Sequence, residues 1–293
     1  MLLNRYTLLG LSSIVIWASL VAVVKLITEQ LSPVQGIALI YSFSALYIGL
    51  RIGLPNIRQM SKAYLLGCGT LFVGYEILFL VSIALSQSRD EVMIIAMINY
   101  LWPPLMIVFS IFAQQLSWRW PVILGFALAV FGLMLVVNPD VLNMARLQYS
   151  LQQNPIAFGF AFIGALLWPS YSILTKRYAR GQNGVPLFFM VSVAALWLVH
   201  YLLDEPFIVP STGLWLSLAV VGALVGIAYS NWNQSMQYGN MQLLIIATYF
   251  MPVISSLISM LILNVQPQFS FWMGTSLVTL GAIVCWKSTA LRA

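Results

Sequence analysis

The sequence predicts an all-α integral membrane protein, with ten transmembrane helices in two inverted five-helix repeats around a central cavity. Three observations predict this fold. Of the 293 residues, 61% are hydrophobic and 7% are charged, and the mean hydropathy is +0.94; a typical soluble domain is about 25% charged. The apolar residues form runs of about 20, the length that crosses a bilayer. The two halves of the chain also share a residue pattern.

Short polar connections separate the ten apolar runs. The first run has no signal-peptidase motif, so we expect it to be a retained span. One longer connection at the midpoint divides the chain into a first repeat (1–137), an extracytoplasmic linker (138–154) and a second repeat (155–293). The expected spans are 7–27, 33–52, 63–85, 91–113, 119–137, 155–176, 186–203, 213–236, 242–264 and 270–287.

The basic residues are distributed unevenly over the connections. With ten spans both termini share a side. Placing them in the cytoplasm puts ten basic residues inside and three, Lys25, Arg89 and Arg146, outside. This bias agrees with the positive-inside rule. The pI of about 9.4 therefore reflects membrane orientation, and no nucleic-acid partner is expected.

Matching residues recur between the two halves at a nearly constant shift. Because each half has an odd number of spans, the second half is expected to be inverted relative to the first. Inverted repeats are common in secondary transporters, whose substrate site lies near the midplane where the repeats meet. The pairs are Trp17–Trp168, Ser19–Ser170 and Lys25–Lys176 at a shift of 151, and Tyr100–Tyr249, Pro103–Pro252, Gly125–Gly274 and Gly132–Gly281 at a shift of 149.

The segment "NYLWPPL" lies in the middle of the fourth apolar run and contains Asn99, Tyr100, Trp102, Pro103 and Pro104. Each proline lacks an N–H and disturbs the preceding helical turn. A broken helix is tolerated at membrane depth only where it is buried in protein or lines a cavity. We therefore expect the two prolines to act as hinges and the other three residues to bind substrate. The alternative is a structural kink with packed aromatic rings.

The matching segment "TYFMPV" places Thr248 and Tyr249 as further binding candidates and Pro252 as a hinge. Ser255 and Ser259 are expected to serve helix packing. The eighth run ends in "YSNWNQSMQY", where Tyr229, Asn233 and Gln237 share a face; these could bind substrate or be solvated.

The first spans of the two halves carry a second aromatic group, Trp17, Trp168 and Tyr171, with Pro169 as a further hinge candidate. Ring faces suit an aromatic substrate, since offset or edge-on ring pairs contribute roughly 0.5–1.5 kcal/mol beyond burial. A substrate ammonium can also lie over such a ring.

Glu76 is the one acid well inside a predicted span, and Tyr75 precedes it. Intramembrane acids are costly and are functional candidates by default. Glu76 could hold a substrate ammonium, carry a coupled proton or pair with a neighbouring helix. His200 is expected in a solvated, interfacial position.

No residue pattern indicates a cofactor or a metal site. The sequence contains neither G-x-x-x-x-G-K-[ST] nor H-E-x-x-H, and Cys68 and Cys285 lie in apolar runs as expected of buried hydrophobes. A membrane-embedded enzyme, the main alternative class, would need converging acids, bases or metal ligands. We therefore expect a protein that is not an enzyme. A channel is a further alternative, although no continuous polar stripe predicts a pore.

The paired five-helix repeats, the tryptophan in the first helix of each half, the proline-bearing fourth helix and the glycine-rich fifth helix resemble the drug/metabolite transporter superfamily in its EamA-type branch. Within that branch, "NYLWPP" and the many ring residues at candidate inward positions make the chain look like the bacterial aromatic amino acid exporters. The resemblance implies export of amino acids, mainly aromatic ones, and related metabolites across the inner membrane by alternating access. A broad drug/metabolite or nucleotide-sugar-like transporter is the alternative. Membrane lipid is an expected partner, and monomer and homodimer both stay open.

Overall fold

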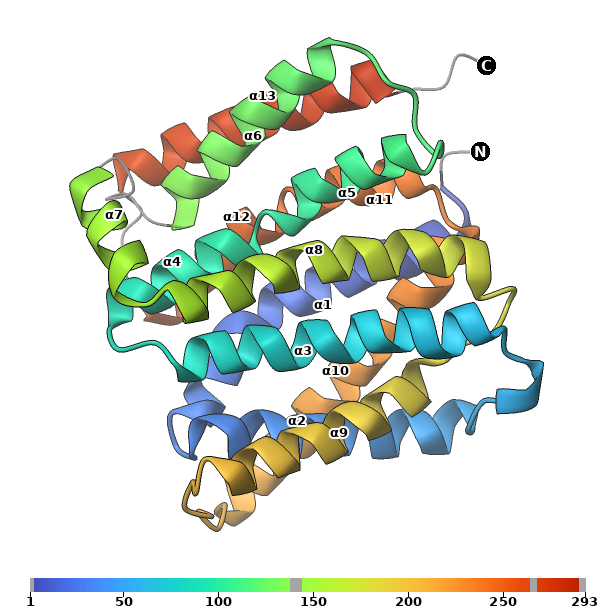
Figure 1. Ribbon diagram of the computed structural model, residues 1–293, viewed down its shortest axis with the longest axis vertical. Coiled ribbons are helices and arrows are strands. Elements are labelled where there is room, and N and C mark those ends of the chain that lie inside the picture. Colours follow the sequence, from blue (N-terminus) through green and yellow to red (C-terminus); the bar gives the residue numbers. More distant parts are fainter. Residues whose placement is uncertain (1–2, 138–143, 264–267, 290–293) are drawn as a thin grey trace.

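The computed structural model describes residues 3–137, 144–263 and 268–289, and within these ranges the regular elements are all helical (Figure 1). This confirms the predicted all-α class. The first half contains α1 (Arg5–Thr28), α2 (Pro33–Ile52), the 3₁₀ turn η1 (Ile57–Gln59), the π-helical η2 (Ala63–Cys68), α3 (Gly69–Ala84), α4 (Arg89–Asn99), α5 (Trp102–Phe112) and α6 (Pro121–Val137). The second contains α7 (Met144–Gln153), α8 (Pro155–Tyr178), α9 (Val185–Leu202), α10 (Thr212–Tyr238), α11 (Met241–Thr248), α12 (Met251–Leu263) and α13 (Phe269–Thr289).

The helices coincide with the ten predicted apolar runs to within two residues at each end, and the fourth and ninth runs are each divided into two helices. Within the expected linker 138–154, residues 144–153 form the polar helix α7, which the apolar pattern does not predict.

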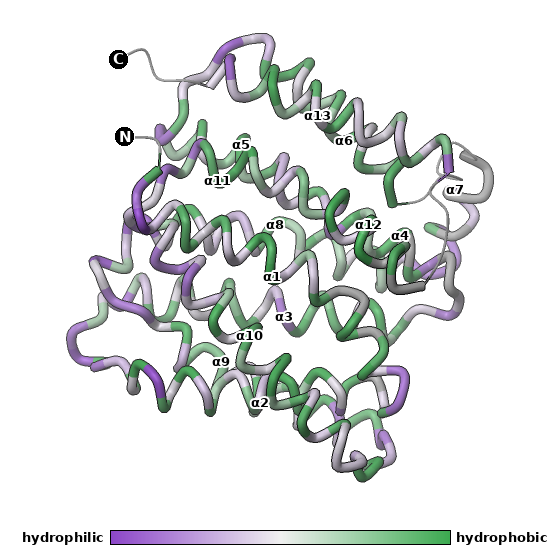
Figure 2. Tube along the Cα trace, turned by 180° about the vertical axis from the view of Figure 1, so that it is seen from behind, coloured by the Kyte–Doolittle hydropathy of each residue, from purple (hydrophilic) through white to green (hydrophobic). Residues whose placement is uncertain are grey.

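Seven helical stretches are long and apolar enough to cross a membrane, and the bent pair α11–α12 makes an eighth. Two shorter apolar segments, Arg5–Leu20 and Pro121–Val137, belong to α1 and α6. Figure 2 shows hydrophobic residues along the middle of the bundle and hydrophilic residues mainly at its two ends. This distribution is that of a multi-pass integral membrane protein.

Helix starts are fixed by local chemistry in the connections. The side chains of Ser88, Asn154, Ser211 and Asn240 accept hydrogen bonds from backbone N–H groups of the first turns of α4, α8, α10 and α11. These groups have no partner within the helix itself, so a side-chain acceptor defines where the helix begins. Proline at the first or second position of α2, α5, α8 and α9 also favours a helix start there, because its fixed backbone angle suits the first turn.

The fourth and ninth predicted spans are broken at the segments where their prolines predict a disturbance. The first break, at Tyr100 and Leu101, separates α4 from α5, so Pro103 and Pro104 fall in the first turn of a new helix. The second, at Tyr249 and Phe250, separates α11 from α12 with a bend of 42°. In contrast, α8 continues without interruption through Pro169.

Helices from opposite halves of the chain pack against each other. The pairs are α1 with α10, α3 with α8, α2 with α9 and α10, and α6 with α13. In Figure 1, α6 and α13 run side by side at one edge of the bundle, and α2 and α9 lie at the opposite edge. The start of α1 and the end of α13 lie at the same end of the bundle (Figure 1).

Glycines allow α6 and α13 to approach at backbone distance. A Cβ atom on Gly132 would lie 2.6 Å from the Gly274 carbonyl oxygen, and one on Gly281 would lie 2.6 Å from the Gly125 carbonyl oxygen. These are the four glycines that pair between the two halves of the sequence. Their matching positions therefore serve one helix–helix contact, the small-residue packing typical of membrane helices.

We expect Gly281→Ala to destabilise the α6–α13 contact by about 1–3 kcal/mol, because its methyl group would overlap backbone atoms of α6 that cannot move aside easily. The apparent melting temperature of the purified protein in detergent measures this effect. Gly159→Ala is the matched control, since its Cβ would meet no atom within 4 Å. Equal melting temperatures for the two variants would contradict the close contact.

Candidate functional site

Trp168 of α8 lies at the centre of a buried group of aromatic rings. Its ring centroid is 5.1 Å from that of Tyr75, 5.3 Å from Tyr171, 5.4 Å from Tyr229 and 5.7 Å from Trp17. These rings come from α1, α3, α8 and α10, which are brought together by the α1–α10 and α3–α8 contacts. Trp168 itself is 3% exposed.

Three further rings complete the group. Phe72 contacts Trp168, Tyr171 and Tyr229 at 5.2–6.2 Å. Trp102 meets Trp168 at 6.4 Å and Trp232 at 6.2 Å, both nearly edge-on. Such edge-on pairs place the positive edge of one ring against the negative face of another. We call the eight rings the central ring cluster: Trp17, Phe72, Tyr75, Trp102, Trp168, Tyr171, Tyr229 and Trp232.

Glu76 is a buried acid beside this cluster, 6% exposed. The Tyr41 hydroxyl of α2 donates a hydrogen bond to Glu76 Oε2, and Tyr229 also lies against the carboxyl group. Among the described residues, Glu76 Oε1 has no hydrogen-bond partner. The Tyr41 hydroxyl therefore holds Oε2 in place with the Tyr229 side chain close to the carboxyl group, and Oε1 accepts no hydrogen bond from the described residues.

The break between α4 and α5 adds polar groups at the same level. Asn99 adjoins Tyr75 and is 8% exposed, while its Oδ1 has no partner within the described part of the chain. The Tyr100 hydroxyl lies 3.4 Å from Ser255 Oγ of α12, which joins the two broken spans. Trp102 is the first residue of α5 and contacts Trp168, so the break directly adjoins the central ring cluster.

The second broken span contributes less to this cluster. The Thr248 hydroxyl donates to the Ile245 carbonyl oxygen at 2.6 Å within its own helix. Tyr249 is fully buried beside Cys285 of α13. Neither residue has a ring contact with the central ring cluster among the described residues. The structure thus brings Trp17, Tyr75, Trp102, Trp168 and Tyr171 into one cluster, with Glu76 and Asn99 beside it and Tyr100 at the adjoining break. Thr248 bonds within its own helix, and Tyr249 lies beside α13.

A polar network closes the cluster towards the end of the bundle where the chain starts. Asn233 Nδ2 donates to the hydroxyls of Tyr64 at 2.6 Å and Tyr171 at 3.0 Å. Its Oδ1 accepts from Gln237 Nε2 at 2.9 Å, and the Tyr64 hydroxyl accepts from the Gly184 backbone N–H at 3.0 Å. The network joins η2, α8, α10 and the connection before α9.

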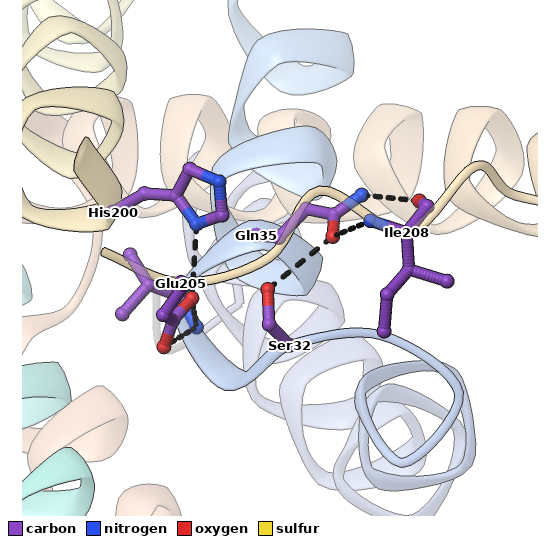
Figure 3. Close-up of polar contacts among 6 residues, drawn as sticks. Ser32, Gln35, His200, Glu205 and Ile208 are labelled. Carbon is purple, nitrogen blue, oxygen red and sulfur yellow. Dashed lines mark hydrogen bonds and ion pairs between the residues drawn. The ribbon is translucent and has the colours of Figure 1, made fainter. Parts of the chain in front are cut away.

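At the other end of the bundle, the connection between α9 and α10 is held against the start of α2 (Figure 3). His200 Nδ1 lies 2.9 Å from Glu205 Oε2, and both Glu205 oxygens accept from the Val34 backbone N–H. The Gln35 amide exchanges two hydrogen bonds with the backbone of Ile208. His200 is only 8% exposed, so the expectation of a solvated histidine is wrong; the folded-back connection covers it.

Several residues of the site escape the sequence interpretation. Phe72 could have been identified, because it precedes Tyr75 by three residues and Glu76 by four and so shares their helix face. Trp232 lies in a run that the sequence marks as unusually polar. Tyr41 has no such signal, since its partner Glu76 is on another helix.

Comparisons with known proteins find relatives that align over almost the whole chain and a family model that matches its second half. The model of the EamA-like transporter family matches residues 155–286. The chain is 35% identical to the aromatic amino acid exporter YddG of Escherichia coli (strain K12), with 98% of both chains covered. It is 34% identical to the protein of the same name from Salmonella typhimurium (strain 14028s / SGSC 2262), with 99% of both covered. A crystal structure described only as that of a protein has a TM-score of 0.78 at 25% identity, covering 96% of this chain and 97% of the other.

We expect Asn233→Leu to lower stability by about 1–3 kcal/mol, because the tyrosine hydroxyls and the Gln237 amide would lose a buried partner. The melting temperature in detergent is the measurement. Asn231→Leu is the control on the same helix, where a half-buried amide makes one bond of 3.1 Å, to Ser12. A fall no larger than that of the control would show that the network contributes no more than a single bond.

Proposed function

The chain belongs to the EamA-like transporter family, in its YddG-like branch, and from this we propose that it exports amino acids, above all aromatic ones, from the cytoplasm. The family is one of transporters and the relatives are named as exporters, so the chain is not an enzyme. The observation that carries the choice of substrate is the central ring cluster.

An aromatic side chain fits this cluster chemically. Each ring contact that the substrate makes is worth roughly 0.5–1.5 kcal/mol beyond the apolar area buried. Trp102 and Trp168 are 2% and 3% exposed, so a substrate ring would replace contacts that the protein rings now make with one another. We propose Trp17, Tyr75, Asn99, Tyr100, Trp102, Trp168 and Tyr171 as binding residues, with Glu76 at the polar end; Thr248 and Tyr249 are proposed as supporting residues of the second broken span.

We further propose ten membrane crossings in two inverted repeats, residues 1–137 and 155–293, joined by 138–154. Counting α1 and α6 with the eight stretches described above gives ten. The packing pattern supports two repeats, because exchanging the halves turns the α1–α10 contact into the α8–α3 contact and leaves the α2–α9 and α6–α13 contacts unchanged.

The proposed mechanism is alternating access, with the four prolines Pro103, Pro104, Pro169 and Pro252 as hinges. Short helices separated by a break can tilt as units while the break absorbs the change in backbone angles. The two breaks lie in corresponding spans of the two halves and are linked through Tyr100 and Ser255. A movement of α5 would therefore displace α12 through this contact.

Purified protein in liposomes is expected to take up labelled tryptophan and phenylalanine faster than threonine or an unrelated dye. Trp102→Ala should reduce tryptophan uptake roughly tenfold, since it removes a ring that contacts both Trp168 and Trp232. Trp118→Ala is the matched control, because Trp118 is 59% exposed at the bundle surface. Uptake of the dye but of no amino acid would favour a broad drug/metabolite carrier instead.

The same liposomes distinguish a carrier from a channel. Unlabelled tryptophan loaded inside should accelerate uptake of labelled tryptophan if access alternates, because the loaded carrier returns with substrate bound. An uptake rate that is independent of internal tryptophan would contradict alternating access.

We propose that both termini lie in the cytoplasm of a bacterium whose inner membrane holds the protein, in keeping with the shared end of α1 and α13 (Figure 1) and the distribution of basic residues. A membrane-impermeant maleimide added to whole cells should label Val209→Cys, in the exposed α9–α10 connection, and should not label Gln59→Cys in η1. The two native cysteines are buried and serve as the unlabelled background. Labelling of Gln59→Cys alone would reverse the orientation.

A further inference from the structure

Trp17 Nε1, Glu76 Oε1 and Asn99 Oδ1 are buried polar atoms around the central ring cluster that have no hydrogen-bond partner among the described residues. Buried polar atoms are nearly always paired, so each exception asks for an explanation. Their side chains surround the same rings. Trp17 contacts Trp168 and Tyr229, Tyr229 lies against Glu76, and Asn99 adjoins Tyr75.

Other indoles in the protein do find partners. Trp232 Nε1 donates to Ser172 Oγ at 3.0 Å, and Trp197 Nε1 donates to Ser42 Oγ at 3.2 Å. The unused N–H of Trp17 therefore sets it apart from two tryptophans in comparable helix–helix packing. Of the two Glu76 carboxylate oxygens, Oε2 accepts a hydrogen bond from the Tyr41 hydroxyl and Oε1 has no partner among the described residues.

The unpaired atoms are chemically complementary to the two ends of an amino acid. An indole N–H can only donate, which suits a carboxylate, whereas an ionised carboxylate oxygen or an amide oxygen can only accept, which suits an ammonium group. Hydrogen bonds to charged groups are the stronger ones. Two other polar groups of the ring cluster are already bonded within the protein, the Tyr171 hydroxyl to Asn233 and Trp232 Nε1 to Ser172.

We propose that Glu76 and Asn99 bind the substrate ammonium, that Trp17 Nε1 donates to the substrate carboxylate, and that the central ring cluster receives the substrate ring. This inference rests on the proposed function and specifies its ligand as a zwitterionic α-amino acid with an aromatic side chain. Tyr41 is a positioning residue, since it fixes the Glu76 carboxylate by one oxygen and leaves the other for substrate.

The test compares tryptophan with two analogues, tryptamine, which lacks the carboxylate, and indole-3-propionate, which lacks the ammonium. Unlabelled compounds compete with labelled tryptophan for uptake into proteoliposomes or for binding to detergent-solubilised protein. For the wild type, we expect half-maximal competition to need each analogue at a concentration roughly ten- to a hundredfold above that of unlabelled tryptophan. This ratio is the loss of affinity expected for one hydrogen bond to a charged group.

Each variant should remove one preference and keep the other. Glu76→Gln should narrow the gap between tryptophan and indole-3-propionate at least severalfold and keep the gap to tryptamine. Trp17→Phe keeps a ring and removes the N–H. It should narrow the gap between tryptophan and tryptamine and keep the gap to indole-3-propionate. If Glu76→Gln does not fold, Tyr41→Phe is measured in its place, with a smaller narrowing of the indole-3-propionate gap expected.

Two controls separate recognition from packing. Trp197→Phe removes an indole N–H already bonded to Ser42, and Glu205→Gln removes an acid bonded to His200 and Val34; both should retain the two wild-type ratios. If Glu76→Gln and Trp17→Phe still transport tryptophan and keep the wild-type analogue-to-tryptophan ratios, this inference is overturned and the proposed function is not. Absence of tryptophan uptake and binding in the wild type would overturn the proposed function with it.

Discussion

The need to satisfy every backbone polar group inside hydrocarbon constrains the whole structure. In the described part of the chain, two spans are broken, and both breaks are arranged so that few donors are lost. Around the first, the N–H groups of Tyr100, Leu101 and Leu105 still reach carbonyl oxygens at 2.9–3.0 Å. Pro103 and Pro104, which have no N–H, occupy the first turn of α5, where an N–H would have no partner within the helix. A break can therefore exist at membrane depth, and the side chains beside it need not follow the spacing of a continuous helix.

Close helix packing at the edge of the bundle complements the large side chains at its centre. Glycines let α6 and α13 touch along their backbones, and Gly222 and Gly226 do the same for α10 against α2, where Ser44 Oγ donates to the Gly222 carbonyl oxygen at 2.7 Å. Membrane helices gain little hydrophobic driving force from association, so such contacts hold the bundle together. The central ring cluster lies between α1, α3, α5, α8 and α10, where its rings form part of the α1–α10 and α3–α8 contacts.

The sequence predicts helix positions well because apolar run length and turn residues are local signals, and it locates both breaks because proline acts on its own turn. It cannot predict which residues meet across helices. Tyr249 matches Tyr100 in the repeat, yet Tyr249 lies beside Cys285 while Tyr100 meets Ser255. Repeats related in sequence can thus differ in which way a ring faces, since that depends on neighbouring helices. Tyr41 and its bond to Glu76 are invisible to the sequence for the same reason.

The mutual packing of the rings in the central ring cluster has a consequence for selectivity in the proposed transport cycle. To admit a substrate, the protein must give up contacts among its own rings, and only a ligand with a comparable ring can replace them nearly one for one. An aliphatic side chain would leave ring faces without equivalent contacts and would be disfavoured even where it fits. In the proposed cycle, selectivity for aromatic substrates would arise from exchange of like ring contacts, and the unpaired atoms of Trp17, Glu76 and Asn99 would set the orientation of the bound ligand.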